Sequence, residues 1–337
     1  MRLITFTRTG RIEPSAHRIG ALIDDGQSAV DIQAVASRHG GAAEPAFASM
    51  IALMEAGPAA LDAARLLVER EAAEGGDAVL PVTEITILAP VPRPTQMRDF
   101  LCFEKHLRQA REIRYRRLAA ETENPDETFA AYEAAGSMNP PQIWYDQPIY
   151  YTCNSLAVVG TGTDIVWPHF AEKMDYELEF GVFIGTGGTD ISRADARDHI
   201  FGFTIFNDIS ARDTQIREMQ GQLGPGKGKD FDTANVIGPC IVTTDEIGDP
   251  YDLVMTARVN GEELSRGNSG EMHHNFEDVI EYISRSTTLY PGEFIGSGTV
   301  GTGCGLEYDR YLEPNDVIEL EIEKIGVLKN RLIRHAS

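Results

Sequence analysis

The chain has 337 residues, 42% of them hydrophobic and 24% charged, as in a globular protein with a sizeable buried core. Its formal net charge of −22 opposes binding to nucleic acids and to anionic membranes. No apolar run approaches the about 20 residues of a membrane helix, and the first residues lack the apolar core of a signal peptide, so we expect a cytoplasmic protein.

The first part of the chain alternates between short strands and helices. Two strand-like runs flank Asp24-Asp25-Gly26-Gln27, a favourable hairpin turn. Apolar residues at helical spacing then predict one helix that ends before Gly57 and a second that begins near Pro58. We therefore predict a small N-terminal α+β domain over residues 1–80, without chemistry of its own.

Short apolar runs dominate the rest of the chain, which we assign to one catalytic domain over residues 81–337. The run Val254–Val259 leads into Asn260-Gly261, a strong hairpin signal. Many strands with few helices favour a β-rich sandwich or roll. A charged segment over residues 107–138 is predicted to be a helical insertion, which is typical of a lid or a dimer element.

The motif Asp175-Tyr176-Glu177-Leu178-Glu179 is the clearest chemical feature. In a strand, Glu177 and Glu179 point to the same face, because side chains alternate. Two carboxylates side by side repel each other unless a cation lies between them. The alternative is a half-exposed strand whose polar face meets water.

Three further segments bring polar residues to the ends of apolar runs. Asp208 ends the run that begins at Phe203 and is placed either to project into a cleft or to cap a helix. The glycine-rich stretch before Lys229 lacks nucleotide-loop spacing, so it is either a loop that brings Lys229 to a pocket or a plain surface loop. Glycines around Thr299 suit either a carboxylate ligand or a wide turn.

His106 is the most promising of the eight histidines, because the others lack a comparable acidic neighbourhood; a structural role is the alternative. Side chains of adjacent residues are expected to diverge in space, so His273 and His274 are not favoured as ligands. The four cysteines are widely spaced, which favours buried reduced thiols over zinc or redox motifs.

Taken together, these segments resemble the fumarylacetoacetate hydrolase family from about residue 88 to residue 332. The most specific matches are Asp-Tyr-Glu-x-Glu and the segment Asn-Asp-x-Ser-Ala-Arg-Asp-x-Gln that begins at Asn207. The resemblance implies a mixed β-sandwich roll beside a small N-terminal α+β domain, and a homodimer. Two family tyrosines are replaced by Leu101 and Met219, which leaves the identity of the substrate open.

The resemblance also implies roles for ten residues. One divalent cation, Mg²⁺ first and Mn²⁺ or Ca²⁺ as alternatives, is expected on four carboxylates: Asp99, Glu177, Glu179 and Asp208. The implied catalytic residues are His106, Glu307, which orients it, and Lys229. The implied substrate-lining residues are Arg212, Gln215 and Thr299.

The expected activity is metal-dependent hydrolysis of a carbon–carbon bond in a β-diketone or acylpyruvate. His106 would activate water, while Lys229 and the metal would stabilise negative charge on oxygen. The alternative on the same scaffold is a decarboxylase or keto–enol isomerase of an oxaloacetate-like acid, which needs no activated water. A protein that binds a metal or ligand without catalysis is the alternative from another class.

Overall fold

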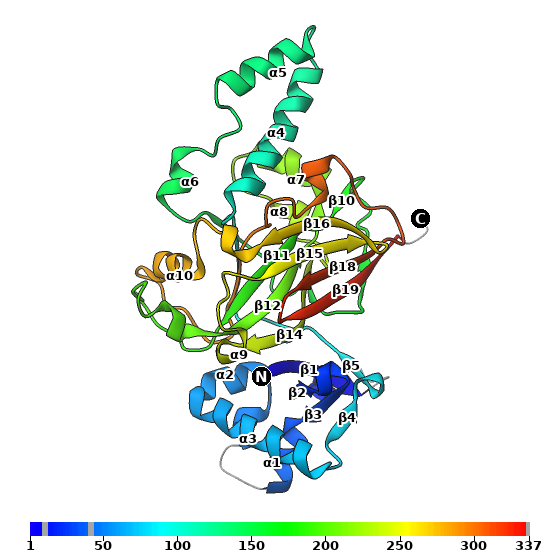
Figure 1. Cartoon of the computed structure of the whole chain (residues 1–337), viewed down its shortest axis with the longest axis vertical. Coiled ribbons are helices and arrows are strands. Elements are labelled where there is room, and N and C mark those ends of the chain that lie inside the picture. The colour runs from blue at the N-terminus through cyan, green and yellow to red at the C-terminus, as the bar shows by residue number, and fades with distance from the viewer. Residues whose placement is uncertain (9–12, 40–43, 335–337) are drawn as a thin grey trace.

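The structure is a computed structural model that describes residues 1–8, 13–39 and 44–334 (Figure 1). Within these ranges the largest sheet has 12 strands. Its order is β4 (Val79–Pro81), β3 (Ser28–Asp31), β2 (Arg18–Ile23), β1 (Arg2–Arg8), β14 (Asn235–Thr243), β12 (Ile200–Asp208), β11 (Leu178–Ile184), β17 (Phe294–Gly296), β6 (Met97–Phe100) and β7 (Tyr150–Thr152). At its sides, β5 (Ile85–Ile87) pairs with β1, and β8 (Val158–Val159) pairs with β14.

A second sheet packs on the central strands of the first. It runs in the order β16 (Glu262–Asn268), β15 (Val254–Val259), β18 (Val317–Ile322), β19 (Gly326–Ile333) and β9 (Asp164–Val166). Phe203 and Ile205 of β12 share one buried core with Met255 and Leu320 of this sheet. A short ribbon joins β10 (Met174–Asp175) to β13 (Ser210–Ala211). The predicted β-rich α+β architecture is confirmed.

The N-terminal strands extend the large sheet, because β1 pairs with β14. Three helices pack beside them at the lower end of Figure 1: α1 (Ile32–His39), α2 (Met50–Ala56) and α3 (Pro58–Glu74). The predicted hairpin forms between β2 and β3, and the two predicted helices meet at Gly57. Ser49 accepts a hydrogen bond from the Ala52 amide and thereby caps α2.

The insertion between β6 and β7 is helical, as predicted. It contains α4 (Glu104–Ala120), α5 (Pro125–Ala134) and α6 (Gln142–Asp146), and Figure 1 shows α4 and α5 extending away from the sheets. Because α4 begins at Glu104, His106 lies in its first turn. Arg111 of α4 donates to the Ser137 carbonyl, just beyond the end of the insertion's second helix. The lid function remains a prediction.

The remaining elements connect the strands. The helices are α7 (Arg212–Met219), α8 (Gly226–Lys229), α9 (Thr244–Ile247) and α10 (Phe276–Ser284). The 3₁₀ turns are η1 (Pro14–Ala16), η2 (Asp24–Gly26), η3 (Glu44–Phe47), η4 (Val82–Glu84), η5 (Ala196–His199), η6 (Ser269–Glu271) and η7 (Gly305–Tyr308). None of the helices in the described ranges is long and apolar enough to cross a membrane.

Candidate active site

Three buried carboxylates meet where the central strands β6, β11 and β12 carry polar residues. Asp99, Glu179 and Asp208 each offer an oxygen, and these oxygens lie within 4.8 Å of one another. Side chains alternate along a strand, so each carboxylate shares its face with apolar residues of the same strand. Those apolar residues belong to one core cluster: Met97, Phe183 and Phe206.

A glycine makes this convergence possible. Strand β17 lies between β6 and β11, and its Gly296 is paired with Asp99 on one side and Gly181 on the other. A Cβ atom at position 296 would lie only 2.4 Å from Asp99 Oδ1. The missing side chain therefore leaves the space in which carboxylates from non-adjacent strands approach each other.

Without a cation, burial and mutual repulsion disfavour the charged forms of the three carboxylates. Burial and the neighbouring Asp208 raise the pKa of Asp99 to about 8. Burial raises the pKa of Asp208 to about 6, and burial together with Asp99 holds the pKa of Glu179 well above its usual value. Among the described residues, Glu179 Oε2 and Asp208 Oδ1 have no hydrogen-bond partner. Buried carboxylates with unused oxygens are the ligands that a hard divalent cation prefers.

Glu177 is held by cations of the protein itself. Its oxygens contact Arg212 Nη2 at 2.7 Å and Lys229 Nζ at 2.5 Å, and the same Nζ lies 2.5 Å from Asp208 Oδ2. Burial opposes ionisation of Glu177, but Arg212 and Lys229 hold its pKa below the usual value. Glu177 thus stands outside the three-oxygen group and is joined to it through Lys229.

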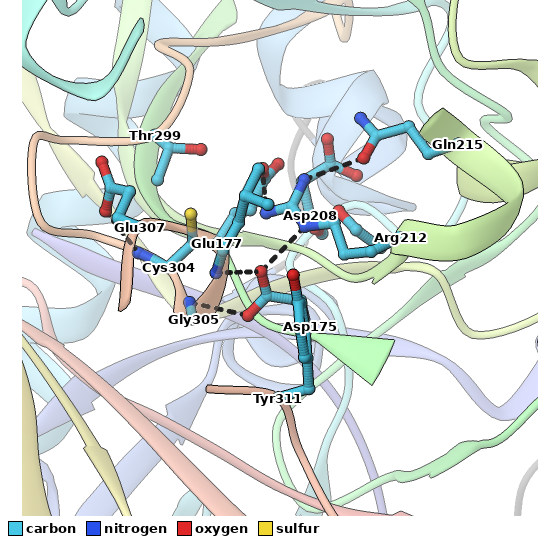
Figure 2. Close-up of polar contacts among 12 residues, drawn as sticks. Asp175, Glu177, Asp208, Arg212, Gln215, Thr299, Cys304, Gly305, Glu307 and Tyr311 are labelled. Carbon is cyan, nitrogen blue, oxygen red and sulfur yellow. Dashed lines mark hydrogen bonds and ion pairs between the residues drawn. The ribbon is translucent and has the colours of Figure 1, made fainter. Parts of the chain in front are cut away.

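Arg212, at the start of α7, fixes the motif that precedes β11. Its Nε donates to Asp175 at 2.8 Å, its Nη2 to Glu177, and its Nη1 to Gln215 Oε1 at 2.9 Å (Figure 2). All three guanidinium nitrogens therefore donate to protein groups, and the side chain is buried. Removing Arg212 would leave the buried Asp175 without a counter-charge and Glu177 paired with Lys229 alone.

The candidate base is His106, whose Nδ1 lies 2.9 Å from Glu307 Oε1. Glu307 also accepts hydrogen bonds from the backbone amides of Thr302, at 3.2 Å, and Cys304, at 3.0 Å. An ionised carboxylate only accepts, so Nδ1 carries the hydrogen in this pair. Nε2 is then the basic nitrogen of the ring.

The carboxylate cluster and the histidine pair adjoin at Cys304. Glu177 forms an isolated antiparallel bridge with Cys304, and the Cys304 Sγ lies 4.0 Å from His106 Nδ1. One short segment of backbone thus borders both parts of the site.

Helix α4 is docked on the loop that carries Glu307. Gln109 Oε1 accepts from the Thr302 amide at 3.0 Å. Further along α4, Arg117 contacts Asp309 at 2.5 Å and also donates to the Tyr311 hydroxyl. These contacts fix the direction of α4 and, through it, the position of His106.

Two polar residues of the site, Tyr151 and Asp175, were not predicted from the sequence as site residues. The Tyr151 hydroxyl donates to Asp208 Oδ2 at 2.7 Å, from the position on β7 that is paired with Asp99. Asp175 is buried and accepts from the amides of Gly305 and Leu306. The available signal for Asp175 is its place in the Asp-Tyr-Glu-x-Glu motif; for Tyr151 the strand after the insertion offers only a weak one.

Comparison with known proteins agrees with this geometry. The family model described as "Fumarylacetoacetate (FAA) hydrolase C-terminal" matches residues 97–333, more than half of the chain. The chain belongs to the fumarylacetoacetate hydrolase family. It is 30% identical to "Oxaloacetate tautomerase FAHD2A, mitochondrial" of Bos taurus, over 99% of this chain and 92% of that protein. It is 33% identical to "Oxaloacetate tautomerase YisK" of Bacillus subtilis (strain 168), over 77% of each.

Solved structures share the fold of this fumarylacetoacetate hydrolase family member. The structure of maleylpyruvate hydrolase from Sphingobium sp. SYK-6 matches with a TM-score of 0.69 and 21% identity, over 99% of this chain and 100% of that one. The predicted family and fold are confirmed. Enzymes of this family use a divalent metal, and the unused oxygens of Glu179 and Asp208 make the acidic cluster a fitting place for one.

The structure brings the ten predicted site residues into one region, and nine of them are buried; Gln215 is half-buried. The predicted metal ligands divide into the three converging carboxylates and Glu177, whose oxygens are paired with cations. Thr299 donates to Glu179 Oε1 at 3.2 Å. The roles of these residues in catalysis remain predictions.

Proposed function

We propose that this family member is a divalent-metal-dependent keto–enol tautomerase of oxaloacetate or a closely related 2-oxo diacid. The observation that carries the proposal is one oriented base, His106 on Glu307, beside an all-carboxylate cation site. Tautomerisation needs little more: one proton must move at carbon, and negative charge must be stabilised on oxygen. The bovine and bacterial relatives are named oxaloacetate tautomerases, which favours the same reaction.

The chain's own residues suffice for the proton transfer. The C3 hydrogens of oxaloacetate lie between a ketone and a carboxylate, so a base can remove one of them. In the direction of the enol, His106 Nε2 takes this proton and the imidazolium then delivers a proton to the enolate oxygen. In the direction of the ketone, Nε2 removes the enol O–H proton and the imidazolium delivers a proton to C3. Glu307 stabilises the imidazolium that forms.

Two groups would supply the positive charge that the reaction needs. A divalent cation held by Asp99, Glu179 and Asp208 would act as a Lewis acid toward the 2-oxo group. Burial opposes the charge of Lys229, but Asp208 and Glu177 hold the pKa of its ammonium above the usual value. Lys229 therefore stays protonated and can donate to an enolate oxygen.

Hydrolysis of a carbon–carbon bond is the second candidate. The sequence favours it because an imidazole paired with a carboxylate is also suited to activate water, and the structure contains that pair at 2.9 Å. The tautomerase names of the relatives weigh against it, so the isomerase alternative now stands first.

Products separate these reactions. The purified protein with Mg²⁺ is mixed with the enol form of oxaloacetate, the decay of enol absorbance is followed, and products are identified by NMR. Tautomerase activity accelerates the decay beyond Mg²⁺ alone and leaves keto-oxaloacetate. Pyruvate with CO₂ would identify a decarboxylase; oxalate with acetate, or cleavage of an acylpyruvate, would identify the hydrolase. No acceleration with any of these substrates would contradict the proposed chemistry.

A further inference from the structure

Three chemically different metal ligands lie together beside the acidic cluster. They are His106, Cys304 and Glu307, and one donor atom from each lies within 4.8 Å of the other two. We propose that this triad is a second metal site, selective for thiophilic divalent cations such as Zn²⁺, and that its occupation inhibits the enzyme. The existence of the site rests on geometry, whereas the inhibition rests on the proposed function.

The distances suit a tetrahedral zinc ion. The His106 nitrogen lies 2.9 Å from the Glu307 oxygen and 4.0 Å from the Cys304 sulfur. Zinc bond lengths place such donors about 3.3–3.6 Å apart in a tetrahedron. The carboxylate and imidazole would separate by a few tenths of an ångström, and the sulfur would approach by a similar amount. A water molecule would complete the tetrahedron.

The ligand types distinguish this triad from the neighbouring carboxylates. Asp99, Glu179 and Asp208 offer oxygen only, which suits Mg²⁺, Mn²⁺ or Ca²⁺. Thiolate and imidazole favour zinc and cadmium over those ions. The two clusters are therefore expected to hold different metals at the same time.

Cys304 is a buried free thiol whose proton a bound metal ion would have to displace. Its side chain is fully buried, and burial together with Glu307 holds the pKa of its thiol well above the usual value. The free thiol is thus protonated and unreactive. A metal ion that binds must displace this proton, which leaves to solvent.

The triad is held in place on both sides. Figure 2 shows Cys304 and Glu307 next to each other on the same loop, where the Cys304 amide donates to Glu307. The backbone bridge to Glu177 fixes Cys304 from the opposite side. On the helix side, Gln109 holds α4 to the Thr302 amide. Little reorganisation is therefore needed to complete the site.

Ligation would remove the base. A metal on His106 Nδ1 replaces the hydrogen that this nitrogen donates to Glu307. The neutral imidazole then carries its hydrogen on Nε2, so Nε2 can no longer accept a proton. Zinc would thus stop the proposed reaction without displacing the cation from the acidic cluster.

Cadmium titration tests the site directly, because a cadmium–thiolate bond has a charge-transfer absorbance that carboxylate ligands lack. The full chain, saturated with Mg²⁺, is titrated with Cd²⁺ as wild type, Cys304→Ala and Cys240→Ala. Cys240 is the matched control, since it is equally buried and free but bonded to the Ile325 carbonyl, away from the triad. We expect one thiolate per chain in wild type and in Cys240→Ala, and none in Cys304→Ala.

Inhibition is then measured as the ratio of activities with and without Zn²⁺ for each variant, at saturating Mg²⁺. Residues that only hydrogen-bond to metal ligands already contribute about 10–100-fold in affinity, so loss of a direct ligand should raise the inhibitory Zn²⁺ concentration at least about 100-fold. Cys304→Ser, which keeps the side-chain size, should behave like Cys304→Ala if the latter is unstable.

The outcomes separate the two claims. A wild-type protein without the thiolate absorbance, or a Cys304 variant that retains it, overturns the site whether or not the protein is a tautomerase. Inhibition that is relieved by raising Mg²⁺ overturns the separate-site interpretation. A thiolate signal at Cys304 with unimpaired turnover overturns the inhibition and retains the metal site.

Discussion

The two parts of the site are held by different kinds of structure. Asp99, Glu179 and Asp208 lie within strands of the large sheet, where backbone pairing fixes their spacing. His106 and Glu307 lie in the first turn of a helix and in a 3₁₀ turn, and side-chain hydrogen bonds hold them together. The cation ligands are therefore part of the core, whereas the base depends on how α4 docks. Substitutions should affect metal binding and proton transfer separately.

Loss of a cation ligand should have the largest effect. Glu179→Gln keeps the size of the side chain but removes the charge, so Mg²⁺ affinity should fall by at least about 100-fold and activity to background. Calorimetric titration with Mg²⁺ measures the affinity. Glu319→Gln on β18 is the control, because Glu319 forms an ion pair with Lys329 in the other sheet. Activity that survives exhaustive EDTA treatment would contradict the cation site.

Removing the base should leave the cation site intact. His106→Ala should lower kcat by about 10²–10⁴-fold, the usual contribution of a general base, with unchanged Mg²⁺ affinity. His169→Ala, at an exposed position, is the control. If the His106 variant instead loses Mg²⁺, the imidazole is a metal ligand and the division into two parts is wrong.

The affinity for Mg²⁺ should depend on pH, because protons compete for the same oxygens. Asp99, with a pKa of about 8, and Asp208, with a pKa of about 6, must lose their protons to bind a cation. Mg²⁺ affinity should therefore rise from pH 6 to pH 8, by about tenfold for each proton displaced per pH unit. Isothermal titrations in several buffers measure both the affinity and the protons released. A Mg²⁺ affinity that stays constant between pH 6 and pH 8 would contradict a cation site formed by these closely spaced carboxylates.

Asp99 and Asp208 also determine how the stability of the metal-free protein changes with pH. Their folded-state pKa values are raised, so between about pH 4 and pH 8 the folded state binds more protons than the unfolded state. The free energy of unfolding should therefore fall as pH rises through this window, and Mg²⁺ should restore it. Urea titrations at pH 5 and pH 8, with and without Mg²⁺, measure both effects. A free energy of unfolding that rises with pH in the metal-free protein would contradict this prediction.

The smallest expected effect concerns the docking of α4. Arg117→Ala removes the contacts with Asp309 and Tyr311, which should lower kcat about two- to fivefold with little change in KM, as expected for a partly exposed pair. Arg116→Ala is the matched control, since Arg116 pairs with Glu112 inside the same helix. Equal effects of the two substitutions would show that docking of α4 does not position His106.

Local patterns in the sequence were sufficient to predict helices and strands and to place part of the candidate site. The alternation around Leu178 placed Glu179 on one face of a strand, and the apolar run before Asp208 placed that carboxylate at a strand end. The approach of Asp99 to these residues was implied by the family resemblance alone and by no local pattern, because it depends on the pairing of β17 with β6 and on the space at Gly296. Strand order in a sheet is a tertiary property.

The partners of Glu177 show a second limit of prediction from local sequence patterns. Period two predicts that Glu177 and Glu179 share a face, but it does not predict that Glu177, directly before β11, pairs with Arg212 and Lys229. Both cations come from segments that are distant in sequence, so no local pattern indicates them. Tyr151 is similar: its hydroxyl reaches Asp208 because β7 returns beside β6 after the whole helical insertion.

The central claim is that His106 transfers the C3 proton of an oxaloacetate-like acid beside a bound cation. Conversion of enol-oxaloacetate in ²H₂O with Mg²⁺, followed by NMR, tests it directly. The wild-type protein should place one deuterium at C3 on a single face, faster than Mg²⁺ alone, and His106→Ala should lose both the acceleration and the stereospecificity. Deuterium placed at random at the rate of Mg²⁺ alone, or stereospecific labelling that persists in His106→Ala, would contradict the claim.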